Sequence, residues 1–337
     1  MATKKNVALR RVFALFLMAA ICVPNAARAA DAGGSTYSVV ICGLGGETEY
    51  EKIFQGWGKD LAAALRKNAV SDDHVYWLAA KKEAGVYAES RQEQIVKVME
   101  TLAGKLAPAD GFQLFLIGHG SFDEYDYRIN LPGADMTASQ FGELLGRIKA
   151  ERQVVVNMTS SSGASIVPLR RKGRVVIAAT SAGRERNFSE FARYFIEALQ
   201  ESAADADKNQ EISALEAYRF ATREVARYYQ SATRLATEHA LLEDRGDQEG
   251  AREPGAENGE GLLAASAVLV RLGDQRAAAD TPETRNLRAA KRKIEEEIET
   301  LKYRKAAIPA EEYSQKLEQL LISLAKTQEQ LDKLEKK

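Results

Sequence analysis

Histidine and serine side chains follow two neighbouring apolar runs of the sequence. His119 and Gly120 follow the run FQLFLI after Gly118, and Ser160 comes shortly after the next run, QVVVNM. A serine hydroxyl becomes a nucleophile when a histidine removes its proton, and backbone N–H groups can stabilise the oxyanion that then forms. His119 is therefore a candidate catalytic residue, and any of the four serines in this second turn, Ser160, Ser161, Ser162 and Ser165, is a candidate nucleophile.

Five apolar runs of strand length alternate with helix-like stretches and must position these side chains. They cover residues 37–42, 74–79, 112–117, 153–158 and 174–180. Such alternation is typical of an α/β fold with a mostly parallel sheet flanked by helices. Ligands of such sheets bind beyond the carboxyl ends of the strands. We therefore expect Cys42, His119 and Ser160 to lie at one edge of a single sheet.

The two turns resemble those of the caspase-like fold of clan CD cysteine peptidases, most closely the legumain-like branch, peptidase family C13. In that family a His-Gly-Ser turn ends one strand and an A-C-x-S-G turn ends the next. Residues 119–121 match the first turn, and Ser162 and Gly163 match the end of the second. The resemblance then places the attacking residue at Ser160, and it implies His119 and Ser160 as the catalytic positions, with the backbone N–H groups of Gly120 and Ser160 as oxyanion donors. The resemblance covers about residues 35–275 and implies a caspase-like domain whose nucleophilic cysteine is replaced by serine.

This replacement changes the chemistry that the resemblance implies. A cysteine ionises near pH 8.5 and a neighbouring histidine lowers that pKa, whereas a serine needs a base in hydrogen-bond contact and a group that orients the base. Asp123, Glu124 and Asp126 follow His119, but no acidic residue stands out as its orienting partner. We therefore interpret the chain as a pseudopeptidase that binds a peptide or a protein.

Two active alternatives stay open. Ser160 and His119 could form a working dyad, which would make the chain a serine-type hydrolase or peptidase. Cys42 ends the first apolar run, and its thiol could approach the imidazole from a neighbouring strand. A buried cysteine is more often a small apolar side chain of the core.

Four further residues are candidate substrate contacts. Ser121 and Ser162 belong to the two matching turns, and Arg184 and Arg186 lie in the loop SAGRERN after the fifth apolar run. Two arginines can hold a substrate carboxylate through bidentate hydrogen bonds. The alternative is that these arginines pair with neighbouring glutamates at the surface.

The segment DADKNQEISALE, residues 205–216, has the ligand spacing of an EF-hand loop, which binds Ca²⁺ through oxygen atoms. The candidate ligands are Asp205, Asp207, Asn209, the carbonyl of Glu211, Ser213 and Glu216. Gln210 stands where such loops have glycine, and a left-handed backbone there costs on the order of 1 kcal/mol. We predict a single structural Ca²⁺ site; the alternative is an acidic helix-capping loop without a metal.

The composition after the α/β domain changes to Lys, Glu, Leu and Ala. Apolar residues at helical spacing occur on both sides of Pro309: Ile294, Ile298 and Leu301 before it, and Leu317, Leu321, Leu324 and Leu331 after it. This spacing predicts two amphipathic helices. We expect residues 276–337 to form an antiparallel helical hairpin or small coiled coil. The hairpin either packs on the chain itself or mediates self-association or binding of a partner.

The first 29 residues have the three parts of a secretory signal peptide. Lysines and arginines precede the apolar stretch from Val12 to Val23, and small residues surround Ala29. The stretch is shorter than the roughly 20 residues of a membrane-spanning helix. We therefore expect a periplasmic or secreted protein without a membrane span after cleavage, whose α/β domain covers residues 30–275.

Charge and composition exclude other classes of protein. Residues 1–29 hold five of the 47 Lys and Arg and none of the 48 Asp and Glu, which leaves a net charge of 42 − 48 = −6. Nucleic-acid binding depends on clustered positive charge, so we expect no nucleic-acid partner. Cys42 would be the remaining cysteine, which excludes an internal disulfide. The three histidines lack zinc-ligand spacing, so Ca²⁺ is the one cofactor we expect.

Overall fold

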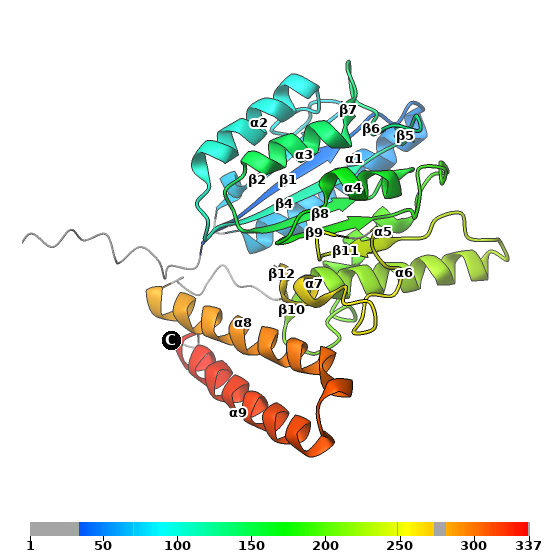
Figure 1. Cartoon of the computed structure of the whole chain (residues 1–337). Helices are drawn as coiled ribbons and strands as arrows, with labels where there is room; N and C mark the ends of the chain where they lie inside the picture. The colour runs from blue at the N-terminus through cyan, green and yellow to red at the C-terminus, as the bar shows by residue number, and fades with distance from the viewer. Residues whose placement is uncertain (1–33, 70, 248, 273–280, 336–337) are drawn as a thin grey trace, which may run out of the picture. The chain divides into compact units, whose positions relative to one another are not determined.

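The strands of the protein form one main sheet. The computed structural model describes residues 34–69, 71–247, 249–272 and 281–335 (Figure 1). The strands of the main sheet are β1 (Thr36–Cys42), β2 (Val75–Ala79), β3 (Ala88–Glu89), β4 (Gly111–Ile117), β8 (Arg152–Asn157), β9 (Arg174–Ala178) and β11 (Leu241–Glu243). Their order is β11-β9-β8-β4-β1-β2-β3. Neighbouring strands are parallel except β9 and β11, which are antiparallel.

The five predicted strands are confirmed as β1, β2, β4, β8 and β9. The predicted α/β class with a mostly parallel sheet is confirmed by their pairing. The apolar pattern of the sequence did not predict β3 and β11, which lie at the two edges of the sheet. They are two and three residues long, too short to show an apolar pattern of their own.

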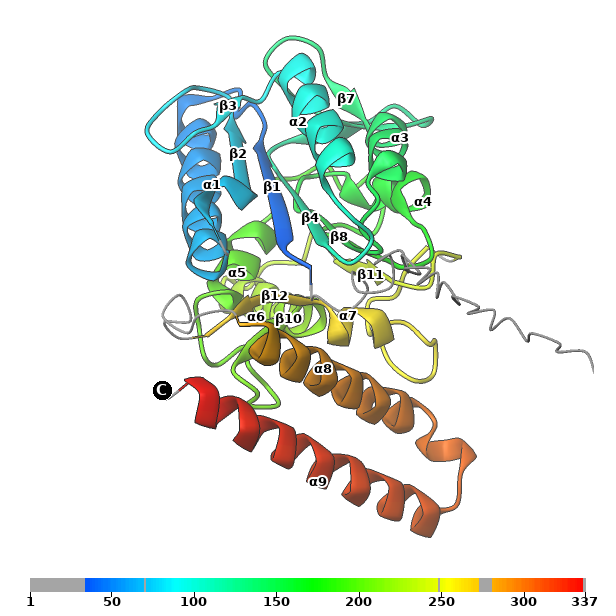
Figure 2. The ribbon, with the colours of Figure 1, turned by 90° about the vertical axis from the view of Figure 1, so that its left-hand side faces the viewer.

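Helices cover both faces of the main sheet. The first layer contains α1 (Thr48–Asn68), α5 (Phe191–Ala198) and α6 (Ala214–Ser231); the second contains α2 (Gln92–Lys105), α3 (Ala138–Arg147) and α4 (Ile166–Leu169). Figure 2 shows α1 and α2 on opposite sides of the sheet. Along β1, Val40 and Cys42 pack in the first layer, and Val39 and Ile41 pack in the second. This is the alternation that a strand buried on both faces requires.

Two smaller sheets extend this core. β5 (Gly120–Phe122), β6 (Tyr127–Ile129) and β7 (Met136–Thr137) form a three-stranded antiparallel sheet directly after β4. β10 (Glu211–Ser213) pairs antiparallel with β12 (Val268–Arg271), which follows the short helix α7 (Leu262–Ser266). The first of these sheets continues from His119 and so builds one wall of the candidate site.

The C-terminal residues form the predicted helical hairpin. α8 (Pro282–Tyr303) and α9 (Ala310–Glu335) pack on each other and are joined by a short turn that contains Pro309 (Figure 1). Ile298, Leu301 and Leu331 are buried. Leu321, which belongs to the predicted apolar face, is instead 48% exposed.

Two predicted features lie outside the described residues. These are the signal peptide, residues 1–29, and the boundary between the α/β domain and the hairpin at residues 275 and 276. Among the helices that the structure describes, none combines the length and the apolar character needed to cross a bilayer.

Candidate functional site

The carboxyl ends of β1, β4 and β8 meet at one edge of the main sheet. Cys42 in β1 lies opposite Ile117 in β4, and Asn157 in β8 lies opposite Leu116. His119 and Ser160 follow these strand ends within three residues. The expectation that strand-end residues Cys42, His119 and Ser160 share one edge is therefore confirmed.

The His119 ring lies among aromatic side chains. Its centroid is 5.0 Å from that of Phe54 and 5.1 Å from that of Tyr50, both on α1 and both in edge-to-face geometry. Phe188 contacts it from the loop before α5. Burial lowers the pKa of the imidazole below 6.5, although a hydrogen bond to the Gly45 backbone acts in the other direction. The ring is therefore neutral at pH 7, which is the form that a general base needs.

The Ser160 hydroxyl is buried and bonded to the backbone of Gly120. The Gly120 N–H donates to Ser160 Oγ at 3.1 Å, and Ser160 Oγ donates to Gly120 O at 3.0 Å. Ser160 is 2% exposed. Ser160 and His119 both lie in the described part of the chain, and no hydrogen bond joins the Ser160 hydroxyl to the His119 imidazole. The Gly120 N–H that we predicted as an oxyanion donor is occupied by the serine itself.

A glycine is required at position 120 for this contact. A Cβ atom there would lie 2.5 Å from Ser160 O and 2.5 Å from the Tyr127 ring, closer than real Cβ contacts. The turn that carries Ser160 can therefore approach β5 only because residue 120 has no side chain.

A buried polar network holds the turn that carries Ser160. Thr159 Oγ1 donates to Asn157 Oδ1 at 2.8 Å and lies 2.6 Å from Tyr127 OH, and Asn157 Nδ2 donates to Ser165 Oγ at 3.0 Å. All four side chains are fully buried. Burial also raises the pKa of Tyr127, so its phenol stays protonated. A satisfied buried network of this kind favours a single conformation of the turn.

The next two serines are also turned away from solvent. Ser161 has a left-handed backbone with φ 59°, and its N–H donates to Glu185 O at 2.8 Å. Ser162 Oγ accepts from the Thr180 N–H at 3.1 Å. Both serines are 0% exposed. Of the two serines predicted to contact substrate, Ser162 is thus enclosed, whereas Ser121 is exposed on β5.

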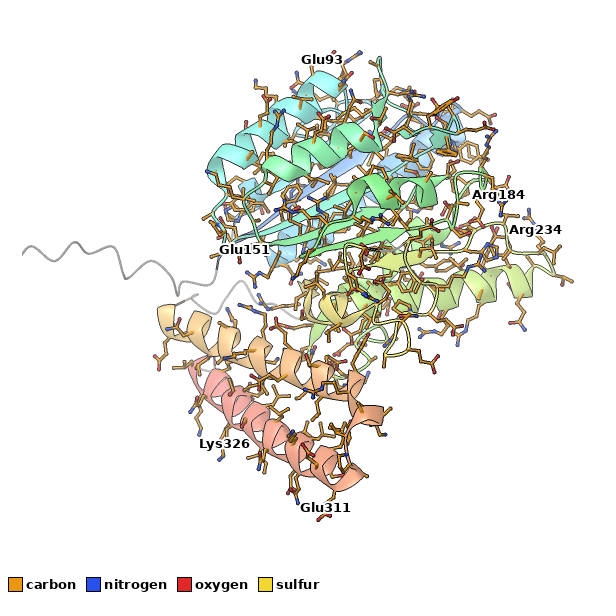
Figure 3. The ribbon with its side chains drawn as sticks, in the orientation of Figure 1. Glu93, Glu151, Arg184, Arg234, Glu311 and Lys326 are labelled. Carbon is orange, nitrogen blue, oxygen red and sulfur yellow. The ribbon has the colours of Figure 1, made fainter. Side chains whose placement is uncertain are left out.

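The loop after β9 presents Arg184 and Arg186 to solvent. Figure 3 shows Arg184 projecting from this loop. Arg186 Nη2 lies 3.5 Å from Phe122 O, a long contact that connects the loop to β5. Glu185 lies between the two arginines in the sequence, but its carboxylate accepts hydrogen bonds from Ser181 and His239.

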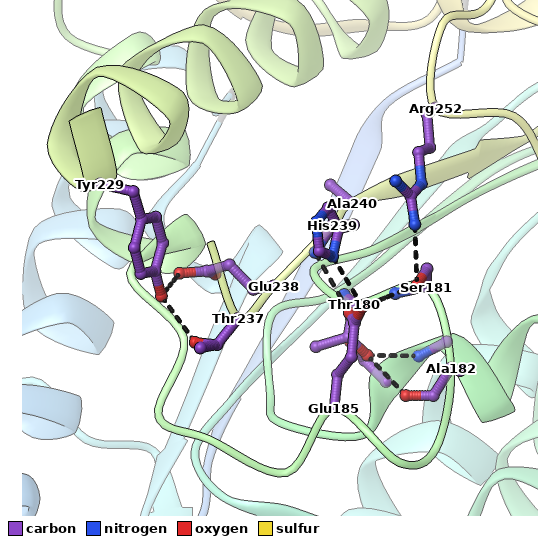
Figure 4. Close-up of polar contacts among 12 residues, drawn as sticks. Thr180, Ser181, Ala182, Glu185, Tyr229, Thr237, Glu238, His239, Ala240 and Arg252 are labelled. Atoms are coloured by element: carbon purple, nitrogen blue, oxygen red, sulfur yellow. Dashed lines mark hydrogen bonds and ion pairs between the residues drawn. The ribbon is translucent and has the colours of Figure 1, made fainter. Parts of the chain in front are cut away.

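Glu185 and His239 form a carboxylate–histidine pair at the carboxyl edge of the main sheet. This pair was not predicted from the sequence. Glu185 Oε1 lies 2.7 Å from His239 Nδ1, and Glu185 Oε2 accepts from the His239 backbone N–H at 3.1 Å. Ser181 donates to the same carboxylate through its N–H and its hydroxyl, both at 2.8 Å (Figure 4). Burial would raise the pKa of Glu185, but the hydrogen bonds from Ser181 and His239 together lower it.

This cluster does not have the order of a catalytic triad. In a triad the histidine lies between the serine and the carboxylate, so that it can take the serine proton. Here Glu185 lies between Ser181 and His239, and the Ser181 hydroxyl donates to the carboxylate. His239 lies two residues before β11, a strand too short to recognise from its apolar pattern, so no local signal in the sequence marked this pair.

The acidic residues after His119 do not contact its ring in the described structure. Asp123 accepts hydrogen bonds from the Asp126 and Tyr125 N–H groups and pairs with Arg128. These contacts, the Asp126 N–H first, lower the pKa of Asp123 to about 2. Asp123 therefore stabilises the turn between β5 and β6 and does not orient the imidazole.

Cys42 is a free thiol buried in the first helix layer. It packs against Gly58 of α1, where a Cβ atom would lie 2.2 Å from Cys42 Sγ. Burial raises the pKa of Cys42 to about 12, so the reactive thiolate is absent at neutral pH. In this position Cys42 acts as a small apolar side chain.

Three carboxylates of the predicted Ca²⁺ loop converge. Oxygen atoms of Asp205, Asp207 and Glu216 lie within 4.8 Å of one another. Burial, and then the charge of Glu216, raises the pKa of Asp207 to about 6, so a cation at this point would relieve an unfavourable concentration of charge. Gln210 has φ 66°, the left-handed backbone expected at this position of the loop.

The same loop also caps α6. Ser213 accepts from the Glu216 N–H, and the Glu216 carboxylate accepts from the Ser213 N–H, which is a capping box. Asn209 Oδ1 accepts from the Glu211 N–H at 2.7 Å. The geometry therefore fits both the Ca²⁺ ligand set and the metal-free capping loop.

A second acidic cluster lies at the end of β11 and in the loop that follows it. Carboxylate oxygens of Glu243, Asp247 and Glu260 lie within 4.8 Å of one another, and Glu260 is fully buried. Asp244 accepts from the N–H groups of Gly261 and Ala264 and so holds the start of α7. Burial and the neighbouring Asp244 carboxyl raise the pKa of Glu260, which favours its protonated form.

No protein-family model matches the sequence, and no curated protein matches it. Three solved structures are similar in fold. The initiator caspase Dronc of Drosophila has a TM-score of 0.40 and 11% identity, with 64% of this chain and 81% of that chain covered. Caspase-1 from Spodoptera frugiperda has a TM-score of 0.41 and 11% identity, with 63% and 89% covered. A Geobacter sulfurreducens protein has a TM-score of 0.38 and 12% identity, with 56% and 89% covered. These similarities are too low to transfer an activity to this chain.

Proposed function

We propose that this chain is an exported, catalytically inactive relative of the legumain-like and caspase-like peptidases that binds an extended peptide at the carboxyl edge of its main sheet. The observation that supports inactivity is the position of the Ser160 hydroxyl. It is buried and bonded to both backbone groups of Gly120, while the His119 ring lies among Phe54 and Tyr50. A serine nucleophile needs its base within hydrogen-bond reach and an unoccupied oxyanion donor.

Exposed side chains around the same edge support peptide binding. Tyr125, in the turn between β5 and β6, is 94% exposed, and Leu235, in the loop that leads to His239, is 90% exposed. Arg184 and Arg186 are also exposed, and their loop lies between Tyr125 and Leu235 in the sequence. Aromatic and apolar side chains beside arginines are typical of surfaces that bind protein segments, and arginine pairs favour an acidic residue in the ligand.

The binding proposal is tested by selecting peptides from a random library against the folded protein and measuring their affinity. We expect enrichment of peptides with an acidic residue, and the Arg184→Gln/Arg186→Gln variant should bind them about tenfold more weakly or worse. Lys326→Gln, on the exposed side of α9, is the matched control and should bind as the unmodified chain does. Equal affinity of the double variant and the control would contradict the proposed surface.

The rival function is hydrolysis by a Ser160–His119 dyad or by the Cys42 thiol. Hydrolysis of the selected peptides by the unmodified chain would support it, provided that the activity is lost in Ser160→Ala and His119→Ala. Activity lost in Cys42→Ser would assign it to the thiol. The pKa of about 12 at Cys42 argues against hydrolysis by the Cys42 thiol.

Ca²⁺ and the C-terminal hairpin complete the proposal. The convergent carboxylates of Asp205, Asp207 and Glu216 would hold a structural Ca²⁺ ion, with Asn209, Ser213 and the Glu211 carbonyl as further ligands. Leu321 and Ile322 of α9 are 48% and 49% exposed, which favours self-association or a partner at that helix face. Export predicts a mature N-terminus near Ala29, which mass spectrometry of the processed protein would identify.

A further inference from the structure

A cavity lies at the amino ends of β8 and β9, at the sheet edge opposite to Ser160. Its volume is about 380 Å³, which is within the size range of small-molecule sites. It is lined by residues 146–151, from the last turn of α3 onward, by Gln153 of β8, and by residues 171–174, which end at the start of β9. Figure 3 shows Glu151 and Arg184 at opposite ends of the sheet. This cavity is therefore separate from the candidate peptide site.

The charged side chains that line the cavity are mostly cationic. They are Arg147, Lys149, Arg171, Lys172 and Arg174, against the single carboxylate of Glu151. The acidic loop after β11 approaches here, because a Cβ atom at Gly246 would lie 2.3 Å from Lys172 N. Asp247 and Glu249 of this loop are exposed, and Asp247 is paired with Arg245 at 3.2 Å. The cavity thus has an excess of positive charge.

Arg174 distinguishes this cavity from an ordinary basic surface, because it is only 3% exposed. Its Nε donates to Gln153 Oε1 at 2.9 Å and its Nη1 donates to Leu169 O, and both acceptors are uncharged. Its Nη2 has no hydrogen-bond partner among the described residues. Burial lowers the pKa of Arg174 to about 10, so the guanidinium still carries its charge at pH 7.

The wall of the cavity and Arg174 are held by the same side chain. Gln153 Nε2 donates to Ile148 O at 3.1 Å and to Ala150 O at 3.0 Å, while its Oε1 accepts from Arg174. The guanidinium is therefore fixed before any ligand arrives, which reduces the entropy cost of binding. A buried cation without an anionic partner costs free energy that a bound anion would offset.

We propose that this cavity binds the phosphate group of a small soluble anion, with the Arg174 guanidinium at its base and Arg171 and Lys172 at its rim. Guanidinium groups match the oxygen geometry of phosphate through paired N–H donors, and lysine adds a point charge. The enclosed position of Arg174 favours a small free ligand over a flat membrane surface.

The test is a calorimetric titration of the full chain with inorganic phosphate and with pyrophosphate, at an ionic strength held constant with sodium chloride. We expect saturable binding of both, and tighter binding of pyrophosphate because it carries more charge. The Arg171→Gln/Lys172→Gln variant should bind about tenfold more weakly or worse. Lys326→Gln on α9 is the control for loss of a positive charge elsewhere and should bind normally.

Arg174→Lys provides a second variant that keeps the charge but removes the paired donors, and it should also weaken phosphate binding. If that variant fails to fold, the exposed Arg171 and Lys172 positions still decide the question. Absence of saturable binding to the unmodified chain, or equal affinity of the Arg171→Gln/Lys172→Gln variant, would overturn the proposal. Binding to phosphatidylglycerol vesicles without binding of free phosphate would overturn it in favour of a lipid headgroup.

Discussion

Gly120 and Ser160 lie so close that the glycine N–H and carbonyl both bond to one hydroxyl. The apolar runs that precede Gly120 and Ser160 predicted that both residues lie at the carboxyl edge of the sheet, because each run ends where its strand leaves the core. They could not predict where the hydroxyl points, since that depends on Tyr127 and Asn157 packing beneath the turn. Nor could they predict the pair of Glu185 and His239, which are 54 residues apart in the sequence.

Gly120→Ala should destabilise the protein by about 1–3 kcal/mol, because the new methyl group would collide with the Ser160 carbonyl and the Tyr127 ring. Thermal unfolding should show this as a lower Tm. Gly56→Ala is the matched control, because nothing lies within 4 Å of a Cβ atom at that position of α1. Alanine there should stabilise the helix by about 0.5–1 kcal/mol. Similar Tm changes in the two variants would contradict the close contact at Gly120.

Ser160→Cys should produce a thiol that reacts with iodoacetamide faster than Cys42 does. The Gly120 N–H, which donates to Oγ in the unmodified chain, would donate to a thiolate and lower its pKa. Burial outweighs the hydrogen bond from the Trp77 side chain and raises the pKa of Cys42 to about 12. Peptide mapping by mass spectrometry measures both rates in one sample. A slower reaction at position 160 would show that the turn encloses the thiol instead of activating it.

At the scale of elements, helices and strands with long apolar patterns were predictable, and short ones were not. The five central strands and both C-terminal helices follow from spacing alone. β3, β11 and the small sheets depend on pairing with distant segments. Spacing also could not show which apolar positions of α9 would meet α8, since Leu321 is half-exposed while Leu331 is buried.

The loop that contains Asp205, Asp207 and Glu216 should bind Ca²⁺ and raise the Tm. A ligand bound only by the folded state contributes about 2.7 kcal/mol at a hundredfold excess over its Kd.

In EDTA the folded chain holds the Asp207 proton more tightly than the unfolded chain does. The Asp207 contribution to stability therefore falls as the pH rises from 3.8 to about 6.

Asp207→Asn separates the metal-bound loop from the metal-free one. In EDTA at pH 7 this variant should have a higher Tm than the unmodified chain, because it removes one of three crowded carboxylates. In millimolar Ca²⁺ its Tm should rise less. An equal rise in both proteins would mean that Ca²⁺ does not bind at these carboxylates.

Glu260 makes the stability of the loop after β11 depend on pH. Burial, reinforced by Asp244, raises the pKa of Glu260, so the folded state keeps its proton to a higher pH than the unfolded state does. Its contribution to stability is therefore complete below the ordinary glutamate pKa of about 4.3 and falls as the pH rises above it. Glu260→Gln keeps the neutral form and should flatten this fall in EDTA. A fall as steep as that of the unmodified chain would show that Glu260 is not its source.

At the scale of the whole molecule, the main sheet separates two groups of polar side chains, one at each edge where its strands end. The carboxyl edge holds His119, Ser160 and the Glu185–His239 pair, and the amino edge holds the basic cavity around Arg174. The alternation of strands and helices made the first region predictable, because ligand sites of parallel sheets lie at the carboxyl ends. The second depends on one arginine at the start of β9 whose burial no local pattern reveals.

The most direct test of catalytic inactivity is the intact mass of the purified chain after incubation with a fluorophosphonate probe. We predict an unchanged mass, because the Ser160 hydroxyl is buried and bonded to Gly120 with no imidazole in contact to activate it. Addition of one probe group, lost in both Ser160→Ala and His119→Ala, would contradict this prediction and establish a serine hydrolase.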